Sequence, residues 1–403
     1  MTKKILVTGG AGYIGSHTIR QLGEAGYDIV VYDNLSTGSG ASVIYGELTI
    51  GSLENKELLL QTFSQHKFDA VLHFAAHISV QESIAKPLNY YTNNTFNTLN
   101  LLDCCQLFHV KKFIFSSTAA VYGQTQQEQI TELSPTQPIN PYGHSKLMSE
   151  QIIQDFAKTS GLKYVILRYF NVAGADSTGK LGQSAKKAEH LIKVACDAAL
   201  GRRSSVNIFG TDLPTPDGTG IRDYIHVEDL AKAHVDALHY LEAGNDSQIF
   251  NCGYGQGYSV REVLNMVQKI SGVDFPVIES QRRVGDPACV VANAHKIRTI
   301  LGWKPKYNSL ETIVSTALMW EQKLITLATL EKNIARQNFK LGALLLEHKI
   351  ISQTQLTQAL QEQSVTKQKL GEILVHKSII PPQMLEKFLL EQNWRKQGIW
   401  LQV

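Results

Sequence analysis

The sequence predicts an α/β protein built on a doubly wound parallel sheet, with a smaller lobe and a small, mainly α-helical C-terminal module. Two observations predict this architecture. In the first two thirds of the chain, short apolar runs alternate with helix-like stretches, and after Trp320 Gly and Pro become rare while Gln, Leu and Lys dominate. Near-continuous apolar strands separated by helices are typical of a parallel sheet that is buried on both faces. The runs are 5–7, 29–32, 70–74, 113–115 and 164–167.

The composition is that of a soluble globular protein, with 43% hydrophobic and 19% charged residues among 403. The net charge of +3 is too small to indicate nucleic acid or an anionic membrane as a partner. No apolar stretch is long enough for a signal peptide or a membrane span. Five scattered cysteines form no C-x-x-C pair, so we expect no metal site and reduced thiols in the cytoplasm.

Three glycines follow the first apolar run and open a helix-like stretch. Gly9, Gly12 and Gly15 have a G-x-x-G-x-x-G spacing, which allows a tight turn and a close approach of backbone N–H groups to a pyrophosphate. Asp33 ends the second run, where a carboxylate binds the adenosine ribose hydroxyls and repels a 2′-phosphate. The sequence therefore predicts a Rossmann-like fold and NAD rather than NADP.

The organisation along the chain follows from these features. We expect an NAD-binding Rossmann-like domain over 1–171 and a substrate-binding lobe over 172–325, some of whose segments return to the first domain. Gly and Pro cluster in 209–218, which predicts an ordered loop. A helix from about 309 to 335 is expected to lead into the C-terminal module, 338–403.

A tyrosine and a lysine four positions apart indicate a catalytic pair. The spacing of Tyr142 and Lys146 puts both side chains on one helix face, where an ammonium stabilises a phenolate and makes the tyrosine a better base. Upstream, a predicted strand ends in hydroxyls at Thr118, at the sheet edge that faces bound ligands.

Seven segments in register resemble UDP-glucose 4-epimerases of the extended short-chain dehydrogenase/reductase family, and the likeness covers roughly residues 3–320. They are 7–17, 33–35, 73–76, 86–94, 141–146, 167–171 and 217–227. The resemblance implies that Tyr142 is the base for the sugar O4 hydroxyl, that Lys146 holds the nicotinamide ribose and lowers the tyrosine pKa, and that Thr118 is the assisting hydroxyl. It implies NAD contacts by Gly9, Gly12, Tyr13, Ile14, Gly15, Asp33, Asn34, Phe74, Ala75, Asn93, Tyr142, Lys146 and Tyr169. It implies UDP-hexose contacts by Thr118, Asn171, His190, Arg222, Arg283, Asp286 and Cys289.

The activity that the resemblance implies is the interconversion of UDP-glucose and UDP-galactose. C4 gives a hydride to NAD⁺, the 4-keto sugar turns over while held by its diphosphate, and the hydride returns to the other face. Cys289 matches a pocket-wall position that is a bulky Tyr in some epimerases. Its small side chain leaves room for the 2-acetamido group of UDP-N-acetylglucosamine, although a small buried hydrophobe explains it equally.

The sequence departs from the family pattern at three positions. Ser52 stands where an acid usually contacts adenine, and Ile78 stands where several members carry a lysine. His190 stands where some members carry a substrate-binding Asn, and we weigh a phosphate contact and a structural role evenly.

The sequence disfavours one other function and leaves two open. A 4,6-dehydratase needs an acid after the catalytic Thr, but Ala119-Ala120 follow Thr118. An epimerase of UDP-xylose or UDP-arabinose and a non-catalytic NAD or nucleotide-sugar sensor both stay open. The family also implies a homodimer that pairs through helices at about 90–108 and 142–160.

The C-terminal module contains an internal repeat. Leu341-Gly342 recurs as Leu370-Gly371, 29 residues later, and Leu and Ile positions recur with the same offset. Residues 338–393 resemble the N-terminal domain of type II secretion and type IV pilus ATPases, some of which bind cyclic di-GMP. The pattern differs in its arginines and its later glycines, so we favour a helical module that binds a protein partner over one that binds cyclic di-GMP. These differences are Lys340 and Lys369, then Lys349 and Ser378.

Overall fold

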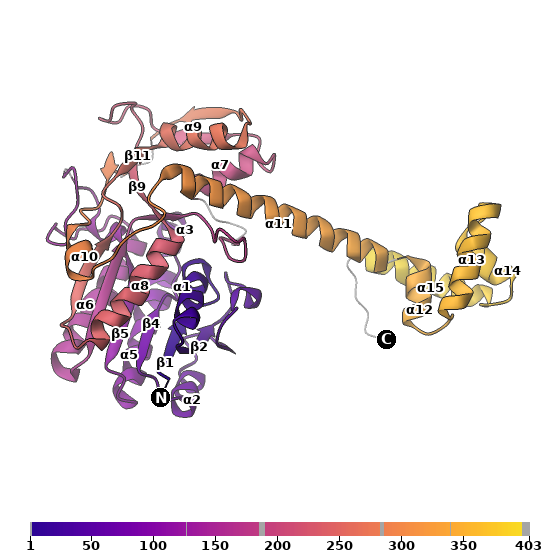
Figure 1. The fold of residues 1–403 in the computed structure, drawn as a ribbon, viewed down its shortest axis with the longest axis horizontal. Coiled ribbons are helices and arrows are strands. Elements are labelled where there is room, and N and C mark those ends of the chain that lie inside the picture. Colours follow the sequence, from indigo (N-terminus) through magenta and orange to yellow (C-terminus); the bar gives the residue numbers. More distant parts are fainter. Residues whose placement is uncertain (1, 126, 185–189, 283–285, 339, 397–403) are drawn as a thin grey trace. The chain divides into compact units, whose positions relative to one another are not determined.

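The structure is a computed structural model, and it describes every residue except 1, 126, 185–189, 283–285, 339 and 397–403 (Figure 1). The chain forms two compact units, Met1–Gln322 and Lys323–Val403. The predicted division of the first unit at residue 171 stays a prediction. In the described part of the chain, no helix is long and apolar enough to cross a membrane.

A seven-stranded parallel sheet lies at the centre of the first unit. Its order is β10-β6-β5-β4-β1-β2-β3, with the direction of winding reversed between β1 and β4. The strands are Lys4–Thr8 (β1), Asp28–Asp33 (β2), Glu47–Ile50 (β3), Ala70–His73 (β4), Lys112–Thr118 (β5), Lys163–Tyr169 (β6) and Gln248–Cys252 (β10). The five predicted runs all form strands of this sheet, which confirms the doubly wound fold. β10 comes from the second half of the chain and pairs with β6.

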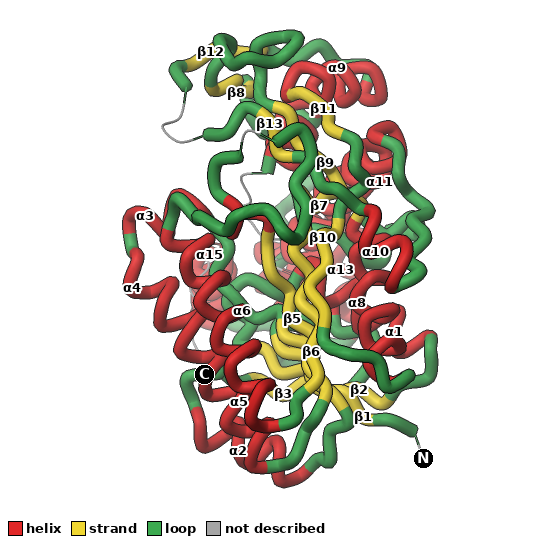
Figure 2. Tube along the Cα trace, turned by 90° about the vertical axis from the view of Figure 1, so that its left-hand side faces the viewer, coloured by secondary structure: helices red, strands yellow, loops and turns green. Residues whose placement is uncertain are grey.

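In the strands other than the edge strand β3, alternate residues enter two different cores, so both faces of the sheet are apolar. In β1, Ile5 and Val7 lie in the core with α1 and α8, while Leu6 lies in the core with α2, α5 and α6. Figure 2 shows the strands between these two sets of helices. The helices are Tyr13–Glu24 (α1), Val227–Glu242 (α8), Lys56–Gln65 (α2), Asn97–Leu107 (α5) and Pro141–Ser160 (α6).

Shorter elements surround the carboxyl ends of the strands. Small strands form a second sheet in the order β11-β9-β13, with β7 also paired to β9, and β8 pairs with β12. These strands are Asn171–Ala173 (β7), Val206–Phe209 (β8), Ile221–His226 (β9), Gly257–Ser259 (β11), Val277–Ser280 (β12) and Cys289–Val290 (β13). The helical elements are Gly40–Ser42 (η1), Val80–Ala85 (α3), Pro87–Tyr90 (α4), Tyr91–Phe96 (η2), Ala119–Tyr122 (η3), Leu191–Ala199 (α7), Val260–Ser271 (α9) and His295–Ile300 (α10).

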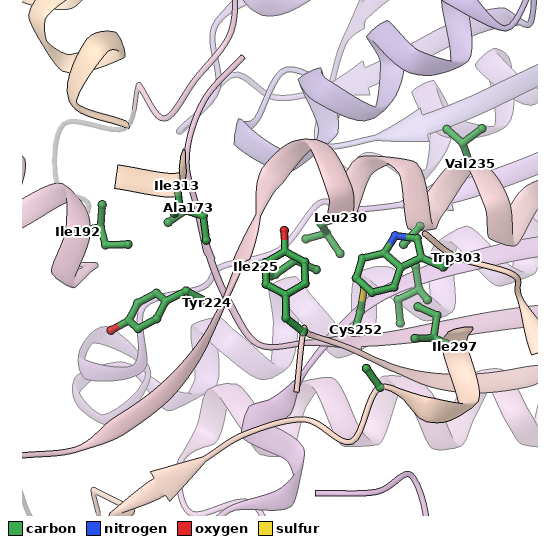
Figure 3. Close-up of a cluster of buried hydrophobic side chains, with 14 of the residues drawn as sticks. Ala173, Ile192, Tyr224, Ile225, Leu230, Val235, Cys252, Ile297, Trp303 and Ile313 are labelled. Atoms are coloured by element: carbon green, nitrogen blue, oxygen red, sulfur yellow. The ribbon is translucent and has the colours of Figure 1, made fainter. Parts of the chain in front are cut away.

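The second sheet shares its core with the first. Ile225 of β9, Cys252 of β10 and Trp303 are each at most 1% exposed and belong to one cluster, part of which Figure 3 shows. This shared core fixes β9 relative to the large sheet, and with it the side chains that β9 carries.

The long helix α11, Leu310–Asn338, confirms the helix expected from about 309 to 335. The second unit then contains two copies of one helix pair, offset by the predicted 29 residues. They are Leu341–Glu347 (α12) with Gln353–Thr366 (α13), and Leu370–His376 (α14) with Pro382–Lys396 (α15).

The repeated glycines bring the two copies together. A Cβ at Gly342 would lie 2.7 Å from Leu356 Cδ1 and 3.2 Å from Leu370 Cδ2, and a Cβ at Gly371 would lie 2.5 Å from Leu385 Cδ1 and 3.3 Å from Leu341 Cδ2. The Leu-Gly motif is therefore explained by internal packing.

Candidate active site

The glycine-rich turn carries α1 to the edge of the sheet. Gly9 has φ +73°, and a Cβ there would lie 2.5 Å from the backbone nitrogen of Ala75. A Cβ at Gly15 would lie 2.3 Å from the carbonyl oxygen of Gly9. These two glycines are thus required by the turn and by the contact of helix with strand.

Gly12 is less enclosed than Gly9 and Gly15, because a Cβ there would make one close contact and no overlap. A Cβ there would meet the Gly9 oxygen at 3.2 Å and no other atom within 4 Å. Gly12 is the N-cap of α1, has no side-chain cap, and is followed by the half-buried Tyr13 and Ile14. An uncapped helix N-terminus presents N–H groups to an anion, so the turn fits the pyrophosphate of a dinucleotide.

Asp33 stands at the end of β2 beside this turn. One carboxylate oxygen accepts from the backbone N–H of Ala11 at 2.9 Å and the other from that of Leu35 at 2.8 Å. Each carboxylate oxygen has a second acceptor position, which suits the ribose hydroxyls of NAD. The neighbouring Asn34 is exposed, and its side-chain oxygen accepts from the Ser36 N–H at 3.0 Å.

The other predicted cofactor residues lie on adjacent strand ends and on one irregular helix. Phe74 and Ala75 follow β4, and both backbone N–H groups donate to Thr8 O. Asn93 lies half-buried in the π-helical turn η2 and donates to the Asn94 side chain at 3.0 Å. Single π-helical turns are frequent at functional sites. Tyr169 ends β6, next to Thr118 of β5.

The catalytic pair lies on α6, as the spacing predicts. Asn140 caps the helix by accepting from the Gly143 N–H at 2.9 Å. A Cβ at Gly143 would lie 2.7 Å from the Ala120 oxygen, so this glycine lets the start of α6 approach η3, the turn that follows Thr118. Tyr142 is 6% exposed and Lys146 is 2% exposed.

Burial and two neighbouring side chains, Tyr169 and Thr118, set the pKa of the Tyr142 phenol. Burial raises the pKa of Tyr142 and the neighbouring Tyr169 raises it further, whereas the hydrogen bond with Thr118 lowers it. Burial also lowers the pKa of Lys146 to about 7. The predicted lowering of the tyrosine pKa by Lys146 stays a prediction, because burial is the dominant influence on the phenol.

The second sheet brings several predicted substrate residues together. Asn171 of β7 pairs with Tyr224 of β9, while Cys289 of β13 pairs with Ile221 at the other end of β9. Arg222 donates to the carboxylate of Asp286 at 2.5 Å and is 16% exposed at its side chain. A planar guanidinium at this place suits a diphosphate.

The remaining predicted positions differ in exposure and in hydrogen bonding. His190 is exposed at the N-cap of α7, and Arg283 lies outside the described residues. Ser52 is half-buried and its hydroxyl accepts from the Glu54 N–H at 3.3 Å, while Ile78 is 51% exposed.

Comparison with known proteins shows the family of this chain. Residues 5–253 match the model of the NAD dependent epimerase/dehydratase family. The curated UDP-glucose 4-epimerase of Azospirillum brasilense is 53% identical over 322 residues, which cover 80% of this chain and 92% of that protein. The chain belongs to this family. Its active site is therefore that of an NAD-dependent epimerase, as predicted.

Solved structures of relatives agree with the fold. The UDP-glucose 4-epimerase from Brucella ovis in complex with NAD is 43% identical, with a TM-score of 0.77, and the match covers 79% of this chain and 98% of that one. The UDP-Glc/GlcNAc 4-epimerase from Campylobacter jejuni is 49% identical, with a TM-score of 0.71 and a match over 80% and 99% of the two chains. About a fifth of this chain is not covered by these relatives.

Sequence reasoning missed the buried polar residues that support the epimerase site. Arg168 of β6 binds the carboxylate of Glu150 on α6 through two nitrogens, and Glu150 lies one turn after Lys146. The spacing of Tyr142, Lys146 and Glu150 at four-residue intervals was the available signal. Asp223 was also missed. Its carboxylate accepts hydrogen bonds from the backbone N–H groups of Tyr254, Gly255 and Ala292, and these bonds hold the part of β9 that carries Arg222.

Proposed function

We propose that this chain interconverts UDP-glucose and UDP-galactose with NAD as a resident cofactor. The observation that carries the proposal is the convergence of Thr118, Tyr142 and Lys146 at one strand end of the sheet that also carries the glycine-rich turn. Ligands of doubly wound sheets bind at this edge, at the point where the winding reverses.

The residues divide the work of the reaction. Tyr142 takes the proton from the sugar O4 and later returns it, and Thr118 donates or accepts at the same oxygen. Lys146 binds the nicotinamide ribose and, in its charged form, favours the phenolate. When bound, NAD⁺ supplies the hydride acceptor for C4, and its positive ring also favours the phenolate. Arg222 holds the diphosphate, so the sugar turns while the nucleotide stays in place.

The proposal is tested with the purified full chain and UDP-galactose, by measuring UDP-glucose formation. Tyr142→Phe is the matched variant: the rate should fall by about 100-fold or more because the base is lost, while NAD extracted per chain stays the same. Absence of turnover with every UDP-sugar, alongside bound NAD, would instead favour the nucleotide-sugar sensor. Faster turnover of UDP-xylose or UDP-arabinose than of UDP-galactose would favour the pentose epimerase.

We propose UDP-N-acetylglucosamine as a further substrate. Cys289 is half-buried on β13 and pairs with Ile221 of β9, the residue before Arg222. Its side chain is small. The relative from Campylobacter jejuni, described as a UDP-Glc/GlcNAc 4-epimerase, supports this range. Assaying wild type with both sugars tests it, and no turnover of the N-acetyl substrate would refute it.

We propose a homodimer that pairs through α5 and α6. Leu99 and Leu107 of α5 and Met148 of α6 are 40%, 62% and 48% exposed. An apolar helical face suits a two-fold contact that buries the same residues of both copies. A light-scattering mass near 44.7 kDa at micromolar concentration would contradict this.

We propose that the helical module binds a protein partner. Leu360 and Leu389 occupy equivalent positions in the two copies and are 45% and 44% exposed, so the repeat presents two matching apolar positions. Cyclic di-GMP is the alternative, and calorimetric titration of the full chain with this nucleotide tests it: saturable binding would overturn the protein-partner proposal. We also propose a cytoplasmic site of action, since all five cysteines are free.

A further inference from the structure

Behind the catalytic pair lies a buried ion pair that the proposed reaction does not use. Glu150 is fully buried on α6 and Arg168 is 4% exposed on β6. The Arg168 Nε donates to both carboxylate oxygens, at 3.0 and 3.1 Å, and a terminal nitrogen donates to Oε2 at 2.6 Å. The Ser117 hydroxyl donates to Oε1. The carboxylate is thus held in one place by three groups of the sheet.

A buried ion pair by itself is weak support for stability, because desolvation offsets much of the attraction. An apolar pair of similar volume would hold α6 against β6 equally well. The charge at this position therefore calls for a reason beyond packing, and its neighbour on the helix supplies one.

Lys146 lies one helical turn before Glu150 on the same face. Its Nζ donates to the carbonyl oxygen of Ser116 at 2.9 Å and lies 4.7 Å from the centre of the Phe115 ring. Neither a carbonyl nor a ring replaces the water that an ammonium loses on burial, so burial favours the neutral amine. Glu150 acts in the opposite direction and raises the pKa of Lys146.

Among the described residues, the other titratable groups next to Lys146 carry no negative charge at neutral pH. His73 of β4 is held neutral, with its pKa lowered to about 3 by burial and by Lys146, and it lies between the hydroxyls of Thr8 and Thr98. Burial raises the pKa of Tyr142 and of Tyr169, so both phenols are protonated. Arg168 is a cation. Glu150 is therefore the negative charge that compensates Lys146.

Resting on the proposed function, we propose that Glu150 is a positioning residue for the epimerisation. Its carboxylate, fixed by Arg168 and Ser117, increases the fraction of Lys146 that is charged, the form that holds the ribose and favours the Tyr142 phenolate.

Hydrogen bonds also connect the pair to Val291, the residue that follows β13. The third guanidinium nitrogen of Arg168 donates to the Tyr122 hydroxyl at 3.0 Å, and this hydroxyl donates to Asn251 Oδ1 at 2.6 Å. The Asn251 amide donates to Ile130 O, and Ile130 N–H donates to Val291 O, each at 2.8 Å. These bonds fix the orientation of Arg168, and through it that of Glu150.

The test is the pH dependence of kcat in the full-length holoenzyme with Glu150→Gln. Activity requires charged Lys146, so the alkaline limb of the profile should move to lower pH by about one unit or more, and kcat at pH 8 should fall about tenfold. KM for UDP-galactose should stay within about twofold, because the carboxylate touches no substrate. Glu150→Asp, which keeps the charge, should keep most of the wild-type limb.

Glu150→Gln leaves Arg168 buried without its partner, so a second variant guards against misfolding. Glu150→Met with Arg168→Met removes both charges and keeps similar volume, and it should shift the limb in the same direction but by less, because the repulsion by Arg168 is lost as well. Glu321→Gln is the matched control: Glu321 is a buried carboxylate bound by Lys193 and Arg202, and its loss should lower the melting temperature without moving the limb.

A readout independent of turnover is the ¹³Cε signal of Lys146, assigned by its absence in Lys146→Met. Its titration midpoint should be lower in Glu150→Gln and in the Glu150→Met, Arg168→Met double variant than in wild type. An unchanged midpoint and an unchanged alkaline limb in folded, NAD-containing variants would overturn the inference and leave the proposed function standing. A wild type without epimerase activity would overturn the proposed function, and the NMR midpoint would still decide whether Glu150 sets the charge of Lys146.

Discussion

Replacing Gly12 and Gly15 separately by alanine should distinguish a glycine needed by the fold from a glycine needed by the cofactor. At Gly12 the backbone has φ −78° and ψ 179°, which alanine adopts freely, and the new methyl would meet one atom, Gly9 O, at 3.2 Å. Replacing an N-cap glycine by alanine costs about 1 kcal/mol or less. The Gly12→Ala protein should therefore fold, with a melting temperature without NAD only a few degrees below wild type.

The same methyl would occupy the space into which the pyrophosphate approaches. Losing one hydrogen bond to a charged group costs about 1.5–3 kcal/mol, so the dissociation constant for NAD should rise by about 10- to 150-fold. In Gly15→Ala the methyl would lie 2.3 Å from Gly9 O and 2.8 Å from Gly10 Cα, so the backbone must shift. That variant should lose several degrees of melting temperature even without NAD.

The assay is calorimetric titration of NAD into apoprotein, together with melting curves with and without NAD. Wild-type affinity for NAD in Gly12→Ala would show that the pyrophosphate does not approach Gly12. Equal losses of NAD-free stability in the two variants would show that Gly12, like Gly15, serves the fold.

Three further changes address the substrate side of the site. Burial raises the pKa of Asp223 from 3.8 to about 6, so between these values the folded chain binds more protons than the unfolded chain, and the free energy of unfolding falls as the pH rises. Asp223→Asn should remove about 3 kcal/mol of this decline. If urea melts from pH 4 to 7 give the same slope of unfolding free energy against pH for wild type and variant, the prediction is refuted. Arg222→Lys should raise KM for UDP-galactose about tenfold with little change in kcat, since a lysine lacks the planar fork; equal falls in kcat and kcat/KM would place Arg222 in the chemical step instead. Cys289→Tyr should suppress turnover of UDP-N-acetylglucosamine selectively, and a parallel loss of both substrates would refute the pocket-wall role.

The large sheet was predictable because its strands are buried on both faces. In β4 and β5, successive residues enter opposite cores, and each run stands out against its polar flanks. β3 gives no such signal: Glu47–Ile50 is at the sheet edge, and Glu47 and Ile50 are exposed. β10 mixes apolar residues with Gln248 and Asn251, and its place beside β6 depends on the path of the chain through the second sheet, which no local pattern encodes.

In the site, too, the residues that were predictable depend on local sequence, and those that were not depend on contacts between distant residues. Tyr142 and Lys146 share one helix face, and the glycine turn is a local device, so spacing sufficed for both. The ion pair of Arg222 and Asp286 joins residues 64 positions apart, and that of Glu150 and Arg168 joins a helix to a strand. Which charged residues are buried together depends on tertiary packing, and a single sequence shows only the residue types.

The helical module has two kinds of tight position in each repeat, a left-handed turn and a close helix contact. Lys349 and Ser378 have φ +55° at the two positions where the resembling domain has glycine, so the backbone keeps a left-handed turn that its side chains disfavour. The turns persist because the neighbouring residues are tied into the core: Ile350 N–H bonds to Leu345 O and Ile379 N–H to Leu374 O, each at 2.9 Å. Gly342 and Gly371, by contrast, are retained because a Cβ at either would overlap a leucine of the packed repeat. Within the module, glycine therefore stands where side chains meet in the packed interior, while Lys349 and Ser378 stand at left-handed turns. Folding of the repeat explains this arrangement without a ligand that approaches the turn backbone, which favours the protein-partner proposal.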